Sequence, residues 1–223
     1  GETEVDVSGL DRDSLMYLIR FLYIKGYDEI KINYDKNVVP HFRVKGEVKV
    51  SSAIHDEVNR LSGFEIIQQR ENYFLIKDIS GTNTKDFDVV LRRILLLLID
   101  ASNDLMEGSK KSDKFLIESI KEKHDTITKF IANNLRILNK IGYTKKNNLT
   151  LYHILYVLDN IADIFKEASI AINKSNIQLS EDTEKIFQIV VSMLGDFQTL
   201  YFKFDKKLIE KISKNRYELI DML

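Results

Sequence analysis

Apolar and polar residues follow two different periods along this chain, and the change falls near residue 80. Before it, short stretches alternate at period two, which indicates half-buried strands. Between these stretches, apolar residues recur every three to four positions, as in amphipathic helices. After residue 85 only long helical patterns follow. The pattern predicts an α+β chain with a small α/β domain at 1–80 and an antiparallel helical bundle at 85–223.

The first 80 residues are predicted to form a βαβαββ layer. The expected strands are 4–7, 29–34, 64–69 and 73–77, and the expected helices are 13–25 and 51–61. Gly26 is placed to end the first helix, and Ser51 or Ser52 is expected to cap the second. The stretch 36–47 holds the only proline, Pro40, and is expected to be a connecting loop.

Beyond residue 85 we expect four long helices. The expected breaks are at 108–112, 142–148 and 173–178. The last helix begins with a capping-box-like Ser180-Glu-Asp-Thr-Glu184 and is expected to continue without a break to Ile212. Short connections between long helices favour antiparallel neighbours and an up-down bundle.

Composition narrows the classes of protein that fit. Lys and Arg total 33 against 34 Asp and Glu, so the net charge of −1 argues against a strongly electrostatic nucleic-acid or membrane partner, although a local patch can lie within a balanced total. The absence of cysteine excludes disulfides and thiolate chemistry and favours a cytoplasmic location. The longest apolar run, 94–99, is too short to insert across a membrane. The chain begins without Met or a signal-peptide pattern, as expected for an excised part of a longer protein.

The third predicted helix carries a row of carboxylates. Asp159, Asp163 and Glu167 lie at i, i+4 and i+8, so they line one edge of the helix. Like charges at this spacing repel, and the row therefore requires either solvation or a compensating cation. Lysines at 121, 123 and 166 are placed to supply that balance.

A metal ion is the other way to compensate the row. The second helix offers Glu122 and Asp125, and antiparallel pairing would bring them opposite Asp159 and Asp163, as in carboxylate sites of helical bundles. These four residues are the candidate ligands for a divalent or ferric ion (Zn, Fe or Mg). His124 is expected to be a buried, hydrogen-bonded histidine rather than a ligand.

Other charged groups have simpler interpretations. Arg92 and Arg93 are expected to pair with Asp86, Asp88 or the hairpin, and Asp100 and Asp104 are expected to be solvated. The run 206–216 is basic and amphipathic, but it lacks interleaved aromatic residues, which favours a solvated helix face over a nucleic-acid site. No Gly-rich phosphate loop, H-E-x-x-H or G-x-S-x-G motif occurs, and the four histidines lie on different predicted elements. The sequence predicts a protein that is not an enzyme.

Several strings resemble one family. Val5-Asp-Val-Ser-Gly-Leu10, residues 18–30, Gly63-Phe-Glu-Ile-Ile67 and residues 73–78 resemble the middle segment of archaeal phosphate-uptake regulators, the PhoU-like proteins. The helical part is similar to a PhoU domain. Leu158-Asp-Asn-Ile-Ala-Asp163 stands where that family shows a Glu/Asp-x-x-x-Asp motif, with Asp159 in place of the commoner Glu.

The resemblance implies a regulator of phosphate uptake that works through contacts with a phosphate-transporter ATPase or a sensor protein. It also implies iron or zinc on acidic helix motifs. Archaeal members often begin with a DNA-binding module of the AbrB/SpoVT kind, which does not precede Glu4 here. The alternative is therefore the dimerising effector part of such a transcriptional regulator, with DNA contacted only through the absent module. The strongly apolar last helix favours a homodimer.

Overall fold

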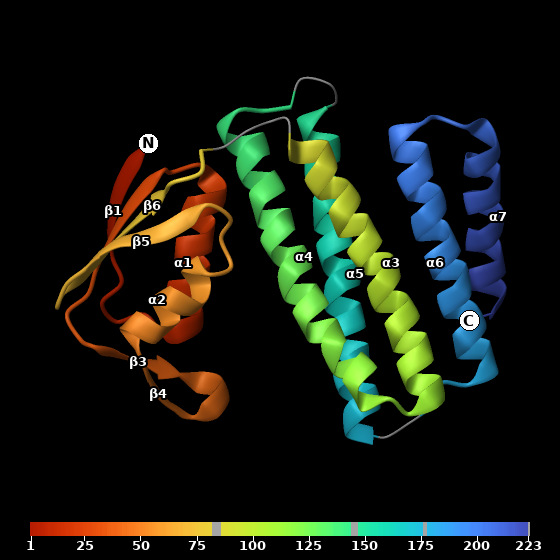
Figure 1. Cartoon of the computed structure of the whole chain (residues 1–223), viewed down its shortest axis with the longest axis horizontal. Helices are drawn as coiled ribbons and strands as arrows, with labels where there is room; N and C mark the ends of the chain where they lie inside the picture. Colours follow the sequence, from red (N-terminus) through yellow and green to blue (C-terminus); the bar gives the residue numbers. More distant parts are fainter. Residues whose placement is uncertain (82–85, 144–146, 176–177, 223) are drawn as a thin grey trace. The chain divides into compact units, whose positions relative to one another are not determined.

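The computed structural model describes residues 1–81, 86–143, 147–175 and 178–222, and it has the expected α+β order (Figure 1). A small sheet domain comes first and long helices follow. The elements are β1 (Glu2–Asp6), α1 (Arg12–Lys25), β2 (Glu29–Asn33), β3 (Val38–His41), β4 (Gly46–Lys49), α2 (Val50–Val58), β5 (Phe64–Gln69), β6 (Tyr73–Asp78), α3 (Phe87–Lys111), α4 (Lys114–Lys140), α5 (Asn148–Ser175), α6 (Glu181–Phe202) and α7 (Lys206–Met222).

The chain divides into two compact units. The first consists of residues 1–87 and 129–155, and the second of residues 88–128 and 156–223. The second half of α4 and the start of α5 therefore belong with the α/β elements. This division differs from a single boundary near residue 80, because long helices contribute to both units.

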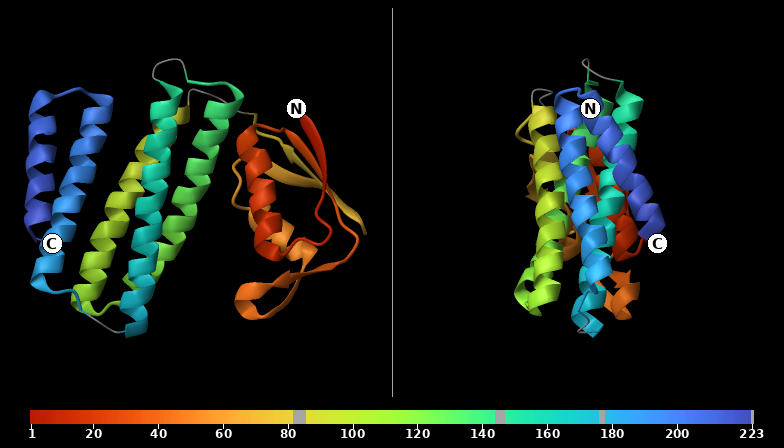
Figure 2. Two further views of the ribbon diagram at one scale, coloured as in Figure 1. Left: turned by 180° about the vertical axis from the view of Figure 1, so that it is seen from behind. Right: turned by 90° about the vertical axis from the view of Figure 1, so that its right-hand side faces the viewer.

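The sheet of the first unit has strand order β1-β2-β6-β5, with β1 and β2 parallel and the other pairs antiparallel. Alternation along β2 and β6 turns Ile30, Ile32, Phe74 and Ile76 to the buried face. Both α1 and α2 cover that face (Figures 1 and 2). At the end of α1, Gly26 adopts the left-handed conformation (φ 102°), as the sequence predicts.

Two predictions about the segment between β2 and α2 are wrong. The expected loop 36–47 contains an antiparallel ribbon of β3 and β4, which carries Val39 into the core. Proline is tolerated there because both strands of a two-stranded ribbon are edge strands. The expected serine cap is also absent: α2 begins one residue earlier, after Lys49, whose side chain makes no capping hydrogen bond.

The second unit departs from the expected helices in two places. The α3 helix continues through Gly108 to Lys111. The expected continuous last helix is broken after Phe202, where the Asp205 side chain accepts the backbone N–H of Lys207 at 2.9 Å and starts α7. Ser180 caps α6 as predicted, through the backbone N–H of Thr183.

Burial is uneven among the helices. The α3 residues Leu91, Ile94, Leu95 and Leu98 are fully buried. By contrast, α6 buries only Leu194, and α7 buries none of its residues within 206–222. Across the described ranges, no helix combines the length and the apolar content needed to cross a membrane.

Candidate functional site

The predicted acidic row lies on α5, and its middle member, Asp163, contacts His124 of α4. His124 Nε2 lies 2.9 Å from Asp163 Oδ1 and 3.2 Å from Lys166 Nζ. His124 Nδ1 lies 3.3 Å from Asp125 Oδ1. The imidazole is largely buried, with 13% of the side chain exposed. His124 is therefore a hydrogen-bonded histidine between two helices, as expected.

The charge of Asp163 is compensated by a lysine. Partial burial acts to raise the pKa of this carboxyl, but hydrogen bonds and attraction from Lys166 and His124 lower the pKa below its usual value. Lys166 forms an ion pair with the oxygen that faces the imidazole. An ammonium group thus already neutralises the carboxylate oxygen of Asp163 that faces α4.

The four predicted metal ligands do not converge. Glu122 is exposed on α4, and Asp159 is half-buried on α5. Among the described residues, no group of three or more His, Asp or Glu side chains could hold a metal ion. Metal binding at Asp159, Asp163, Glu122 and Asp125 therefore stays a prediction without support from this geometry.

Charged side chains of α3 make two contacts that differ from the expected solvation or were not expected at all. Asp104 is not simply solvated, because it pairs with Lys123 at 2.6 Å and accepts the Ser119 hydroxyl at 3.2 Å. The Arg92 guanidinium lies 3.9 Å from the centroid of the Phe202 ring, a stacking contact with α6 that the sequence did not suggest.

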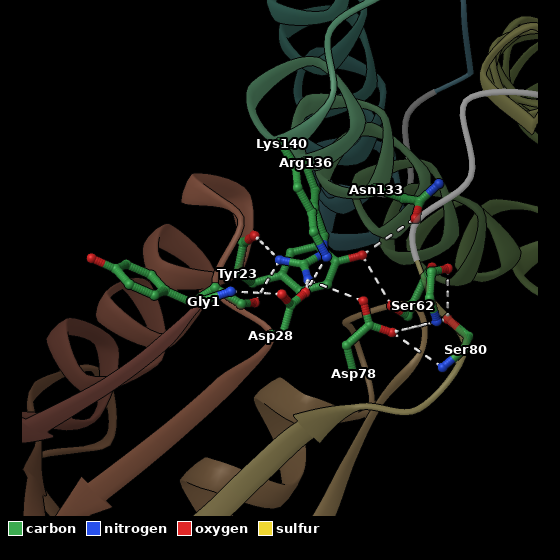
Figure 3. Close-up of polar contacts among 11 residues, drawn as sticks. Gly1, Tyr23, Asp28, Ser62, Asp78, Ser80, Asn133, Arg136 and Lys140 are labelled. Atoms are coloured by element: carbon green, nitrogen blue, oxygen red, sulfur yellow. Dashed lines mark hydrogen bonds and ion pairs between the residues drawn. The ribbon is translucent and has the colours of Figure 1, made fainter.

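A buried polar cluster centres on Arg136 and was missed by sequence reasoning (Figure 3). The Arg136 side chain, on the second half of α4, is only 1% exposed. One guanidinium nitrogen donates to the carbonyl oxygens of Tyr23 and Tyr27, both at 2.7 Å. The other donates to Asp28 at 2.9 Å and to Asp78 at 3.0 Å. The cluster thereby joins α4 to the end of α1 and to β6 within the first unit.

The groups around Arg136 are held in the charge states that the cluster needs. Partial burial acts to raise the pKa of Asp28, but hydrogen bonds and attraction from Lys140 and from the Gly1 ammonium lower it to about 2. Burial raises the pKa of the Tyr23 hydroxyl, and the nearby guanidinium only partly opposes this. At neutral pH an anionic Asp28 and a neutral phenol therefore surround the buried cation.

A second buried ion pair joins α1 to α2. Arg20 donates through Nε and Nη2 to the two carboxylate oxygens of Glu57, at 2.7 and 3.0 Å. Glu57 is fully buried. Burial raises its pKa, and the Arg20 bonds oppose that rise. This bidentate geometry is the arrangement in which a buried carboxylate is best compensated.

Described residues of the first unit line a larger and a smaller hollow. The larger has a volume of about 640 Å³ and is lined by Tyr34, Asn37, Val38, Lys49, Ser51, Gln69, Arg70 and Glu71. The smaller, about 250 Å³, contains Ser8, whose hydroxyl accepts the backbone N–H of Asp35 at 3.1 Å and so holds a loop. Neither lining includes a histidine, and neither presents a nucleophile beside a base.

No protein-family model matches the chain, and no curated protein or solved structure is significantly similar to it. The resemblance to PhoU-like regulators therefore remains a prediction from the sequence strings.

Proposed function

We propose that this protein regulates phosphate uptake through contacts with another protein, a phosphate-transporter ATPase or a phosphate sensor. The link to phosphate rests on the resemblance of the strings in residues 5–30 and 63–78. The contact with a protein partner is supported by one observation, an exposed apolar face on α5. The proposal requires no metal ion.

The α5 helix has two apolar faces. The inner one is buried and consists of Leu151, Leu155, Leu158, Ala162, Phe165 and Ile172. The outer one is exposed: Tyr156 and Ile164 are each 64% exposed, and Val157 and Ile170 also lie in solvent. We call these four residues, together with Ala171, the outer α5 face.

The outer α5 face has the pattern of a helix-packing seam. Val157, Ile164 and Ala171 recur at seven-residue intervals, the repeat by which one helix packs along another. An exposed apolar row of this kind typically marks a protein-interaction site, and here the polar residues Asn160 and Glu167 border it. A helix or a helical groove of a partner protein fits this stripe.

The same face also supports the alternative function. The seam is symmetrical about Ile164, with Val157 and Ala171 seven residues to either side. Two antiparallel copies of α5 would therefore place Ile164 against Ile164. In that case the chain would act as the dimerising effector part of an AbrB-type regulator.

Binding to the purified transporter ATPase encoded in the same genome tests the proposal, at low and at high phosphate. We expect Ile164→Glu to weaken binding by about tenfold or more, because a charge enters an apolar contact. Phe115→Glu is the matched control, since Phe115 on α4 is 80% exposed and lies outside the outer α5 face. Absence of binding by the unaltered chain at both phosphate concentrations would overturn the proposal.

Sedimentation of the same variants distinguishes the alternative function, self-association through the outer α5 face, from binding of the ATPase. A dimer that Ile164→Glu converts to a monomer, without any binding of the ATPase, would assign the outer α5 face to self-association. A chain that is monomeric both with and without the substitution would exclude that alternative.

A further inference from the structure

Positive charge concentrates at the connection between α6 and α7 and along α7. We call residues 203–216 the basic segment. Its cations are Lys203, Lys206, Lys207, Lys211, Lys214 and Arg216, against the two carboxylates Asp205 and Glu210. One of these carboxylates, Asp205, is engaged as the cap of α7. The whole chain carries a net charge of −1, so this concentration is local to the hairpin of α6 and α7, whose backbone Figure 2 draws in blue.

An aromatic side chain lies exposed within this charge. Phe204 is 71% exposed, in the connection between Lys203 and the lysines that begin α7. Further along α7, Ile209 and Ile220 are also exposed. The packing of α7 is accounted for by its half-buried residues Leu208, Ile212 and Leu219. The side chains of Phe204, Ile209 and Ile220 take no part in that packing and stay exposed.

A fixed guanidinium lies near the same connection. Arg92 of α3 stacks on Phe202, the last residue of α6 and two positions before Phe204. Within the basic segment, Lys211 forms an ion pair with Asp196 of α6 at 2.8 Å, which neutralises its charge. Exposed lysines flank Phe204 in the sequence: Lys203 precedes it, and Lys206 and Lys207 follow it.

We infer that the basic segment docks on the surface of a membrane that contains anionic lipid. Lysines in a cluster of this size are attracted to an anionic bilayer without specific contacts. An exposed phenylalanine between them can enter the interface, where its ring leaves water while the ammonium groups stay at the headgroups. This is binding at a surface and not insertion across it.

Charge complementarity favours a bilayer over the other occupants. A second copy of the same segment would bring cation against cation. A nucleic acid would also attract the lysines and offers bases to stack on the exposed rings of Phe204 and Tyr217, so it is the competing occupant that the test has to separate. The exposed Ile209 and Ile220 add apolar surface that a bilayer interface can receive and a phosphate backbone cannot. The inference goes beyond the proposed function and does not depend on a phosphate partner.

Co-sedimentation of the full chain with vesicles tests this inference. We expect binding to phosphatidylcholine vesicles that contain phosphatidylglycerol, no binding to phosphatidylcholine alone, and weaker binding as salt is raised. The triple variant K203E/K206E/K207E should bind roughly a hundredfold more weakly, since each lysine near an anionic surface contributes about fivefold. Phe204→Ala should lose about fivefold through the missing apolar contact.

The control variants make the same kinds of substitution at exposed positions outside the basic segment. Lys121→Glu with Lys174→Glu reverses two exposed lysines on α4 and α5, and Phe115→Ala removes an exposed ring. These variants should bind the anionic vesicles like the unaltered chain, with unchanged thermal unfolding in all cases. No binding to anionic vesicles, or equal loss in the controls, overturns the inference. Tighter binding to duplex DNA than to vesicles, lost in the triple variant, would assign the segment to nucleic acid instead.

Discussion

The Arg136 cluster of the first unit and the His124 cluster of the second use similar side chains with different consequences. Around Arg136, the carboxylates of Asp28 and Asp78 meet a fully buried guanidinium that also bonds two carbonyl oxygens. Around His124, Asp163 is half-exposed and is paired with a lysine. The first arrangement holds a core together, and the second balances charge near the surface. Burial, rather than residue type, therefore decides how much a charge contributes to the stability of the fold.

Removal of Arg136 should have the largest effect on stability. Arg136→Met removes the donor to Asp78 Oδ2 and to the carbonyl oxygens of Tyr23 and Tyr27 from a buried site, so we expect a loss of about 3–5 kcal/mol in the free energy of unfolding. Denaturant unfolding followed by circular dichroism measures it. Arg216→Met on α7, which is exposed, is the control and should cost less than about 0.5 kcal/mol. Equal losses in the two variants would contradict the comparison.

The Arg20–Glu57 pair should rank second. Glu57→Gln keeps the shape of the side chain but removes the charge that Arg20 requires, with an expected loss of about 2 kcal/mol. The same unfolding experiment applies. Asp56→Asn is a neighbouring control, because Asp56 contacts Arg12 at 3.4 Å on the exposed side of α2. A larger loss of stability in Asp56→Asn than in Glu57→Gln would contradict this prediction.

Asp28 should make the free energy of unfolding depend on pH in the acid range. Its pKa is about 2 in the folded chain, below the ordinary value of a carboxyl, so the ionised form stabilises the fold above roughly pH 4. That contribution is lost as the pH falls from about 4 through 2. Because Asp28 is about a third exposed, solvent screening reduces the effect to about 1 kcal/mol. Unfolding of Asp28→Asn should show a shallower pH dependence over this window, and an unchanged profile would refute the assignment.

The His124 cluster should show the smallest effect. Asp163→Asn should change stability by less than about 1 kcal/mol, since the ion pair is half-exposed. Zinc added to chain purified without a chelating tag should not raise the unfolding temperature, because Lys166 compensates Asp163. A rise that Asp163→Asn abolishes would instead support the metal prediction made from the acidic row.

Local patterns in the sequence predicted the elements that local forces determine. Period-two alternation found β2 and β6, and Gly26 marked the end of α1. The break before α7 was missed because Leu200, Phe204 and Leu208 keep helical spacing through it. The ribbon of β3 and β4 was missed because its proline favours a loop.

The buried charges could not be read from any local pattern. Arg136 lies 108 residues from Asp28 and 58 from Asp78, so only the tertiary fold brings these groups together. A charged residue within a helix is ordinarily expected on the solvent face, and among the described residues Arg136 and Glu57 depart from that expectation. The acidic row on α5 was located correctly, and Lys166, one of the three lysines expected to balance it, pairs with Asp163.

Hydrogen exchange with and without the purified transporter ATPase shows whether the second unit supplies the contact surface while the buried charges of the first unit only stabilise its fold. The account predicts added protection of backbone amides in α5 between Tyr156 and Ala171, absent in Ile164→Glu, and no change around Arg136. Protection centred on Arg136 or on the hollows of the first unit, with α5 unaffected, would contradict it.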